Sequence, residues 1–129
     1  MYTFNKKERL KNRKNITFLF EKGYSFFIYP FKVYYLFNQA EENLDHAAVL
    51  FSVGKKQFKH AVDRNRVKRL CRETYRLNKS ILIEKLKEKK ISMEVAFVYV
   101  GKTEPDFHEL EFKMQKILAH LAELEKNST

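Results

Sequence analysis

The 129-residue chain has few of the residues on which secreted, membrane-embedded or nucleotide-hydrolysing proteins depend. Its one cysteine, Cys71, excludes a disulfide or a thiolate metal cluster within the chain and favours a reducing compartment. Among three glycines, Gly54 precedes two lysines but lacks the other glycine and the hydroxyl of a phosphate-binding loop. No apolar run approaches the ~20 residues that cross a bilayer, and the first residues lack a signal peptide's apolar segment. We therefore expect a cytoplasmic chain without a membrane anchor or nucleotide hydrolysis.

The chain also lacks an arrangement of side chains suited to catalysis or metal binding. The four histidines are scattered, and His108 has no second histidine four residues later, as a zinc-binding helix requires. No carboxylate cluster or histidine pair suits acid–base or metal-assisted cleavage of a phosphodiester. Cys71 falls on the apolar side of a predicted helix, where it is expected to be a core residue. We predict no catalytic residues and no metal site in the protein.

Positive charge is abundant instead, and it is concentrated. The net charge is +10, and residues 55–79 contain ten Lys or Arg against Asp63 and Glu73. Within the predicted helix, cations follow one another at four-residue spacing, which destabilises a helix unless an anion relieves the repulsion. Arginine predominates, and its planar fork suits bidentate phosphate contacts. We predict a nucleic-acid-binding surface made of Lys55, Lys56, His60, Arg64, Asn65, Arg66, Lys68, Arg69, Arg72 and Arg76.

Aromatic residues are the second abundant class, with seven Tyr and twelve Phe. Many lie between residues 24 and 37, where alternation places Tyr34 and Tyr35 on opposite faces of a strand. Rings on an open strand face suit stacking with unpaired bases, so RNA is favoured over DNA. The candidates for such stacking are Phe20, Tyr34 and Tyr35. We expect core packing for Phe18, Phe51 and Phe97.

The periodicity predicts an α+β fold in one domain, residues 1–129, with the order α-β-β-β-α-β-α and a four-stranded sheet packed by helices. Asn15 is expected to cap the first helix and Gly23 to end it in a left-handed conformation. The segment Thr103-Glu-Pro-Asp106 is expected to form a capping box at the start of the last helix. The predicted segments are a helix over 15–23, strands over 24–37 split at Pro30, a loop over 38–45, a strand over 46–53, helices over 60–77 and 80–89, a strand over 92–100 and a terminal helix from 107. The buried side of helix 60–77 is predicted to contain Val62, Val67, Leu70, Cys71 and Thr74 or Tyr75.

The cationic region resembles the protein subunit of bacterial ribonuclease P. The resemblance rests on Ser52-Val-Gly-Lys-Lys56, Ala61-Val62, Arg64-Asn65-Arg66-Val-Lys68-Arg69, Arg72-Glu73 and Arg76, in the family's order and spacing. Phe4, Lys7, Arg9-Leu10 and Phe20-Glu-Lys-Gly23 support it, so that it covers nearly the whole chain. Asp63 departs from the basic residue common before the Arg-Asn-Arg segment, and Phe58-Lys59-His60 is less glycine-like than usual.

This resemblance implies a subunit of an RNA-based endonuclease in which the RNA, not the protein, is the catalyst. The cationic helix would bind the catalytic RNA near its active site. A cleft between the first helix and the sheet, through Phe20 and one or both of Tyr34 and Tyr35, would hold the single-stranded 5′ leader of precursor tRNA. Mg²⁺ would be held mainly by the RNA, with no cofactor bound by the protein alone. The resemblance also implies a left-handed crossover between the third and fourth strands.

Three other functions compete with this one. A ribosomal or general RNA-binding protein would use the same helix without an aromatic cleft. A DNA-binding protein would need a second helix in helix-turn-helix position or heptad repeats, and the sequence has neither. A protein-only nuclease is least favoured, because the chain has no carboxylate cluster.

Overall fold

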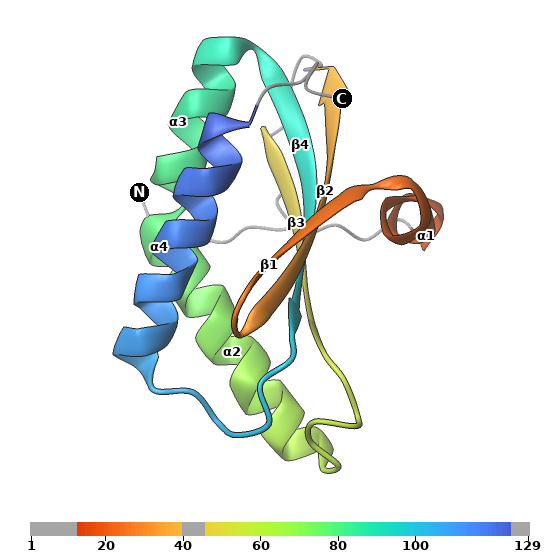
Figure 1. Cartoon of the computed structure of the whole chain (residues 1–129), viewed down its shortest axis with the longest axis vertical. Helices are drawn as coiled ribbons and strands as arrows, with labels where there is room; N and C mark the ends of the chain where they lie inside the picture. Colours follow the sequence, from red (N-terminus) through yellow and green to blue (C-terminus); the bar gives the residue numbers. More distant parts are fainter. Residues whose placement is uncertain (1–12, 40–45, 125–129) are drawn as a thin grey trace.

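The computed structural model describes residues 13–39 and 46–124, which form three layers. A four-stranded sheet lies between one helix on one face and three helices on the other (Figure 1). This is the α+β architecture that the hydrophobic periodicity predicts. The elements are α1 (Arg13–Lys22), β1 (Tyr24–Ile28), β2 (Phe31–Gln39), β3 (Ala47–Val53), α2 (Ala61–Asn78), α3 (Ser80–Lys89), β4 (Ile91–Tyr99) and α4 (Phe107–Glu123).

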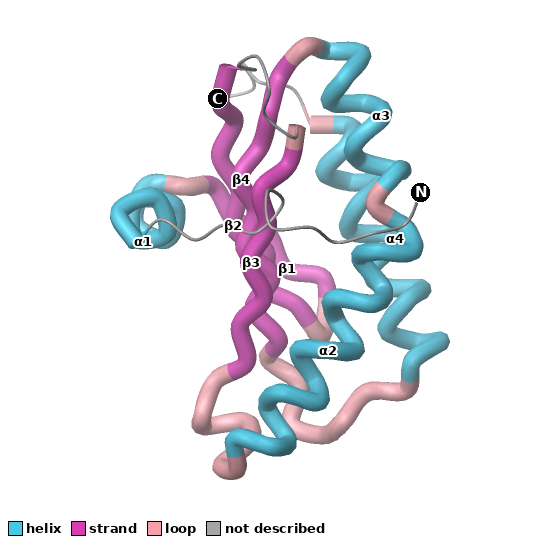
Figure 2. The backbone as a smooth tube through the Cα atoms, turned by 180° about the vertical axis from the view of Figure 1, so that it is seen from behind, coloured by secondary structure: helices cyan, strands magenta, loops and turns pink. Residues whose placement is uncertain are grey.

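The sheet is mixed, with strand order β1-β2-β4-β3. The β1–β2 and β2–β4 pairs are antiparallel, whereas β3 and β4 are parallel and are connected through α2 and α3. Figure 1 shows these helices on one side of the sheet with β3 behind β4, and Figure 2 shows β3 in front from the opposite side. Seen from the helices with both strands pointing up, β4 therefore lies to the left of β3. The crossover is left-handed, against the usual right-handed rule.

The main core lies between the sheet and α2, α3 and α4. It forms because each helix has an apolar stripe and because alternate residues of the strands face the same side, as in β3, where every second residue is buried. Phe51 and Phe97 stack at its centre, with ring centroids 5.0 Å apart. The helices contribute Val67, Cys71, Tyr75, Leu82, Leu86, Leu110, Met114, Ile117, Leu118 and Leu121.

A smaller apolar cluster attaches α1 to the opposite face. Leu19 is fully buried against Ala96 of β4, with Tyr34 and Leu36 of β2 packed around them. The single helix covers only part of this face, because α1 contacts β2 and β4 in this cluster and does not extend over the sheet's far end. Among the residues that the structure describes, no helix other than α1 lies on this face, and one end of the sheet there forms what we call the uncovered surface.

Most element boundaries agree with the sequence prediction to within one or two residues, and Pro30 lies between β1 and β2 as expected. The predicted loop over 38–45 is partly wrong because β2 continues to Gln39, while residues 40–45 lie outside the described residues. Two burial predictions are also wrong. Val62 and Phe18 have 67% and 55% of their surfaces exposed, since each lies on the solvent side of its helix.

At three helix ends, the residue or backbone conformation predicted to begin or end the helix is wrong. Asn15 lies inside α1, which already includes Arg13, so it does not occupy the position before the helix. Gly23 has no positive φ; a side chain there would place its Cβ 2.4 Å from the carbonyl oxygen of Leu19, so the glycine is needed for space. The left-handed residue is Lys90, with φ 57°, at the end of α3. The cap of α4 is Asp106, whose carboxylate accepts a hydrogen bond from the Glu109 amide.

Candidate nucleic-acid interface

Helix α2 has a buried apolar side and an outer side that carries the cations. Val67, Cys71 and Tyr75 are buried against the sheet, so the arginines between them point away from the core. Burial also raises the pKa of the Cys71 thiol to about 12, which confirms a core cysteine and removes it as a nucleophile at neutral pH. The predicted nucleic-acid-binding residues thus lie on the outside of α2 and in the loop that precedes it.

Arg64 differs from the other cations because it holds the chain that enters the helix. Its Nη1 donates to the carbonyl oxygens of Phe58 and Lys59, both at 2.9 Å. Phe58 itself packs against the main core and approaches the ring of Tyr99. Arg64 therefore orders the loop that carries Lys55 and the other lysines before α2, in addition to any phosphate contact.

Two further cations of α2 have acidic partners within the protein. Arg66 lies 3.1 Å from the carboxylate of Glu104 and 3.6 Å from that of Asp63. Arg76 pairs with Glu73, with Nη2 at 2.6 Å from one carboxylate oxygen, and this hydrogen bond lowers the pKa of Glu73. The like-charge repulsion expected from the sequence is thus partly relieved. Glu104 lies 38 residues from Arg66, and helical spacing gave no signal for it.

Three other cations of α2 have no acidic partner among the described residues. The side chains of Lys68, Arg69 and Arg72 form no ion pair or hydrogen bond with the part of the chain that the structure describes. Arg69 and Arg72 are exposed, as are Lys55 and Lys56 in the preceding loop. His60 is exposed at the start of α2, and its side chain makes no capping hydrogen bond. These groups are available to an anion.

An aromatic surface occupies the opposite face of the sheet, beside α1. The rings of Phe20 and Tyr34 meet edge to face at 4.8 Å, so the structure brings these two predicted residues together. The ammonium group of Lys32 lies 5.2 Å from the centre of the Tyr34 ring. A ring and a cation held together in this way suit a base and its phosphate.

Tyr35 does not belong to this surface. It lies on the helical face of the sheet, where its ring approaches those of Tyr24 and Phe26 at 5.6 and 5.9 Å. Burial raises the pKa of its hydroxyl. Because successive residues of a strand point to opposite faces, Tyr35 and Phe20 cannot line one cleft, and the prediction that allowed both Tyr34 and Tyr35 is corrected for Tyr35.

The sequence analysis missed two residues of the uncovered surface. The strand register places Phe27 opposite Lys32, and Lys32 opposite Val98. Val98 in turn lies opposite Ser52 of β3. This row crosses the sheet beyond α1, and 58% of Phe27 is exposed. The alternation in β1 contained the signal for Phe27, but the pairing of Phe27 with Lys32 needed the register.

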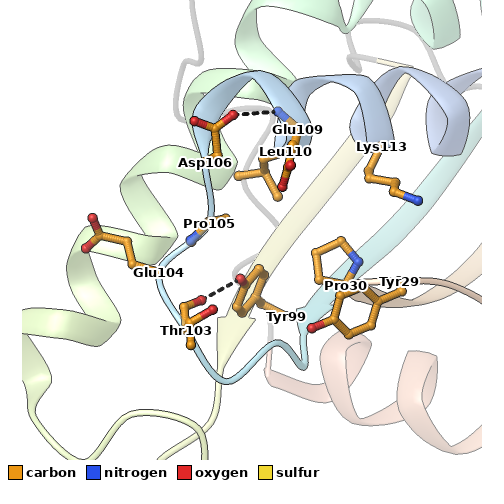
Figure 3. Close-up of a pocket in the computed structure, with 10 residues that line it drawn as sticks. All are labelled: Tyr29, Pro30, Tyr99, Thr103, Glu104, Pro105, Asp106, Glu109, Leu110 and Lys113. Carbon is orange, nitrogen blue, oxygen red and sulfur yellow. Dashed lines mark hydrogen bonds between the residues drawn. The ribbon is translucent and has the colours of Figure 1, made fainter.

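Other kinds of site are not formed by the described residues. No three His, Cys, Asp or Glu side chains in the ranges 13–39 and 46–124 gather as metal ligands, and none of the described helices is long and apolar enough to cross a membrane. A cavity of about 210 Å³ does open beside the start of α4 (Figure 3). It is lined by Tyr29, Pro30, Tyr99, Thr103, Glu104, Pro105, Asp106, Glu109, Leu110 and Lys113.

Comparison with known proteins relates both surfaces to one family. The family model described as Ribonuclease P matches residues 4–122. A ribonuclease P protein component from Porphyromonas gingivalis is 43% identical over 121 residues, covering 94% of this chain and 88% of the relative. One from Chlorobium phaeobacteroides is 31% identical over 128 residues, covering 92% and 88%. The match therefore extends over both the cationic helix and the aromatic face.

Solved structures share the fold. The ribonuclease P protein of Staphylococcus aureus superposes with a TM-score of 0.67 at 23% identity, covering 98% of this chain and 99% of that one. The protein of Thermotoga maritima gives a TM-score of 0.67 at 24% identity, covering 88% and 96%. The three-layer architecture is therefore common to these chains.

Proposed function

Because the chain belongs to the ribonuclease P protein family, we propose that it binds the catalytic RNA of ribonuclease P and the 5′ leader of precursor tRNA, and so assists removal of the leader. Membership implies a role in an endoribonuclease complex and an RNA partner. The observation that carries the finer proposal is the pair of surfaces. Arg69 and Arg72 of α2 are exposed without an acidic partner among the described residues, and aromatic rings cluster beside α1 on the other face of the sheet.

The outside of α2 is proposed as the contact with the catalytic RNA. Arg69 and Arg72 are exposed and have no acidic partner in the described chain, so a phosphate meets their full charge. Guanidinium groups bind phosphate through two parallel hydrogen bonds, which gives orientation as well as affinity. The loop with Lys55 and Lys56, held in place by Arg64, extends the same surface.

The uncovered face beside α1 is proposed as the contact with the leader. Single-stranded RNA exposes the faces of its bases, and Phe20, Tyr34 and Phe27 offer rings of matching size. Lys32, between the two strand aromatics, suits the phosphate that follows a stacked base. Stacking of this kind tolerates any base sequence, as a leader that differs between precursors requires.

The chemistry of cleavage is assigned to the RNA partner. The described residues supply neither a metal cluster nor a nucleophile with a lowered pKa, since the Cys71 thiol is buried. We propose that Mg²⁺ is held mainly by the catalytic RNA and that the protein alone binds no cofactor. We also propose a cytoplasmic location, because the buried thiol suits a reducing compartment.

The proposal is tested by leader cleavage of a precursor tRNA at low Mg²⁺ concentration. The catalytic RNA of the source organism is assayed with and without the protein, and the protein alone is the control. Cleavage should be stimulated only when both are present. Tight RNA binding without stimulation would overturn the proposal in favour of a general RNA-binding protein, and cleavage by the protein alone would contradict catalysis by the RNA.

A further inference from the structure

Arg66, a cation of α2, contacts an acidic residue of a distant element. Its Nη1 donates to Glu104 Oε1 at 3.1 Å, across the junction between α2 and the loop that connects β4 to α4. Both side chains are about half exposed, at 51% and 48%. An exposed pair of this kind adds little to stability, so its presence on an RNA-binding helix calls for another explanation.

The loop that carries Glu104 is held on both sides. Before it, the hydroxyl of Tyr99 donates to the carbonyl oxygen of Thr103 at 2.8 Å. After it, Pro105 restricts the backbone and Asp106 caps α4. Figure 3 shows Glu104 pointing away from the cavity, toward the neighbouring helix. The backbone that carries Glu104 is therefore restrained beside Arg66.

Gly101 makes this arrangement possible. A Cβ at position 101 would lie 2.6 Å from the hydroxyl oxygen of Tyr99 and 2.8 Å from the ring carbon that bears it. Any side chain there would displace the Tyr99 ring from Thr103. A chain of contacts thus runs from Gly101 through Tyr99 and Thr103 to Glu104, and ends at the guanidinium of Arg66.

Glu104 uses only part of the guanidinium. Arginine has five N–H donors, and the hydrogen bond to Glu104 engages Nη1 alone, which leaves Nε and Nη2 for another acceptor. Asp63 lies 3.6 Å from the same Nη1 and restrains it from within α2. With one edge of the fork held by carboxylates, the other edge has a defined direction and loses less entropy on binding a phosphate.

We propose that Glu104 is a positioning residue, which orients Arg66 for a phosphate of the catalytic RNA. This inference rests on the proposed function of α2 as the RNA-binding helix. If Glu104 has this role, the β4–α4 loop is a part of the RNA interface, although the Glu104 side chain is negatively charged like the RNA. The sign of charge also provides the test. Through simple repulsion, removing a carboxylate near RNA raises affinity, whereas removing a positioning carboxylate lowers it.

The experiment measures the Kd of the full-length protein for the catalytic RNA with Glu104→Ala and Glu104→Gln. We expect Glu104→Ala to weaken binding about two- to fivefold, the scale of an exposed pair, and Glu104→Gln to weaken it less, because the amide oxygen still accepts from Arg66. Glu109→Ala is the matched control: it removes an exposed carboxylate five residues along the chain that has no ion pair with α2 among the described residues, and the affinity of this variant should be unchanged or slightly higher. Equal gains in affinity for both Glu104 variants would overturn the inference.

A double-mutant cycle separates positioning from a general structural effect. In the Arg66→Ala background, Glu104→Ala should cause no further loss, since there is no guanidinium to orient. Gly101→Ala should reproduce the loss of Glu104→Ala through the displaced Tyr99 ring. Equal losses from Glu104→Ala with and without Arg66 would overturn the inference.

Failure of the inference is distinguishable from failure of the proposed function. If Arg66→Ala leaves the affinity unchanged while Arg69→Ala lowers it, Glu104 has no positioning role and α2 still binds RNA. If neither arginine matters, the proposed RNA contact of α2 fails, and the inference fails with it.

Discussion

Tyr34 and Tyr35 are adjacent in the chain, yet they lie on opposite faces of the sheet. Tyr34 meets Phe20 and Lys32 beside α1, whereas Tyr35 packs with Tyr24 and Phe26 under α4. The strand pleat causes this separation and gives neighbouring tyrosines different environments. A single-residue change on each face can therefore report whether the leader binds only one of them.

Tyr34→Ala should weaken binding of precursor tRNA to the assembled complex by about fivefold or more, the cost of one lost stacking contact. Tyr24→Ala is the matched control, since it removes a half-exposed tyrosine from the opposite face. Affinity for mature tRNA, which has no leader, should be unchanged in both variants. The measurement is the Kd for each RNA, and equal losses for Tyr34→Ala and Tyr24→Ala would rule out the α1 side as the specific leader surface.

At the scale of elements, α2 combines a cationic side, which we propose binds RNA, with a junction to α4. Its C-terminal residue Asn78 donates to the carbonyl oxygen of Thr74 at 2.8 Å and to Glu111 at 2.9 Å, and it accepts from Gln115 at 3.0 Å. Asn65, a second asparagine of the same helix, is exposed between Arg64 and Arg66. We therefore expect Asn78 to contribute to the stability of the fold and Asn65 to contribute to RNA binding.

Asn78→Ala should lower the free energy of unfolding by about 1–2 kcal/mol, because it removes the two hydrogen bonds between α2 and α4 and the one to Thr74 within α2. Asn65→Ala should leave stability unchanged or slightly higher, since alanine favours a helix, but it should weaken RNA binding. Urea denaturation and RNA titration of both variants check this. Loss of stability in Asn65→Ala, or loss of affinity alone in Asn78→Ala, would contradict the division of the helix into two roles.

At the scale of the whole molecule, the sheet separates two surfaces of different chemistry. Helix α2 lies on one face and α1 on the other (Figure 2). The cations belong to α2, and the rings of Phe20 and Tyr34 meet beside α1. A net charge of +10 would attract RNA to any part of the protein, so the structure matters for where the phosphates bind. Salt dependence measures this directly, because it counts the phosphate contacts that are made.

The double variant Arg69→Gln/Arg72→Gln should reduce the slope of log K against log salt concentration by about two, close to one for each lost phosphate contact. Lys87→Gln/Lys116→Gln removes the same charge from exposed positions on α3 and α4, and the slope should stay near that of the unmodified protein. Catalytic-RNA affinity measured over a range of salt concentrations provides both slopes. Identical slopes for the two variants would mean that RNA binds through diffuse charge and not through α2.

Much of the fold follows from local pattern. The alternation in β3, the stripe of α4 and the break at Pro30 each predict an element whose bounds the structure confirms. The cationic side of α2 is also local, because Arg69 and Arg72 diverge from buried Val67 and Cys71 by helical geometry alone. The error at Gly23 arose because the close carbonyl oxygen of Leu19, and not a left-handed backbone, requires glycine there. The error at Thr103 arose because Asp106, three residues later and also a favoured capping residue, caps α4.

By itself, the sequence determined the composition, the order of elements, the cationic helix and, through its motifs, the family. Only the tertiary structure decided which residues from distant segments meet. It paired Phe27 with Lys32 through strand register, assigned Tyr35 to the helical face and brought Glu104 to Arg66. The physical reason is that periodicity describes one element at a time, whereas contacts between elements depend on how the sheet, the crossover and the loops pack together.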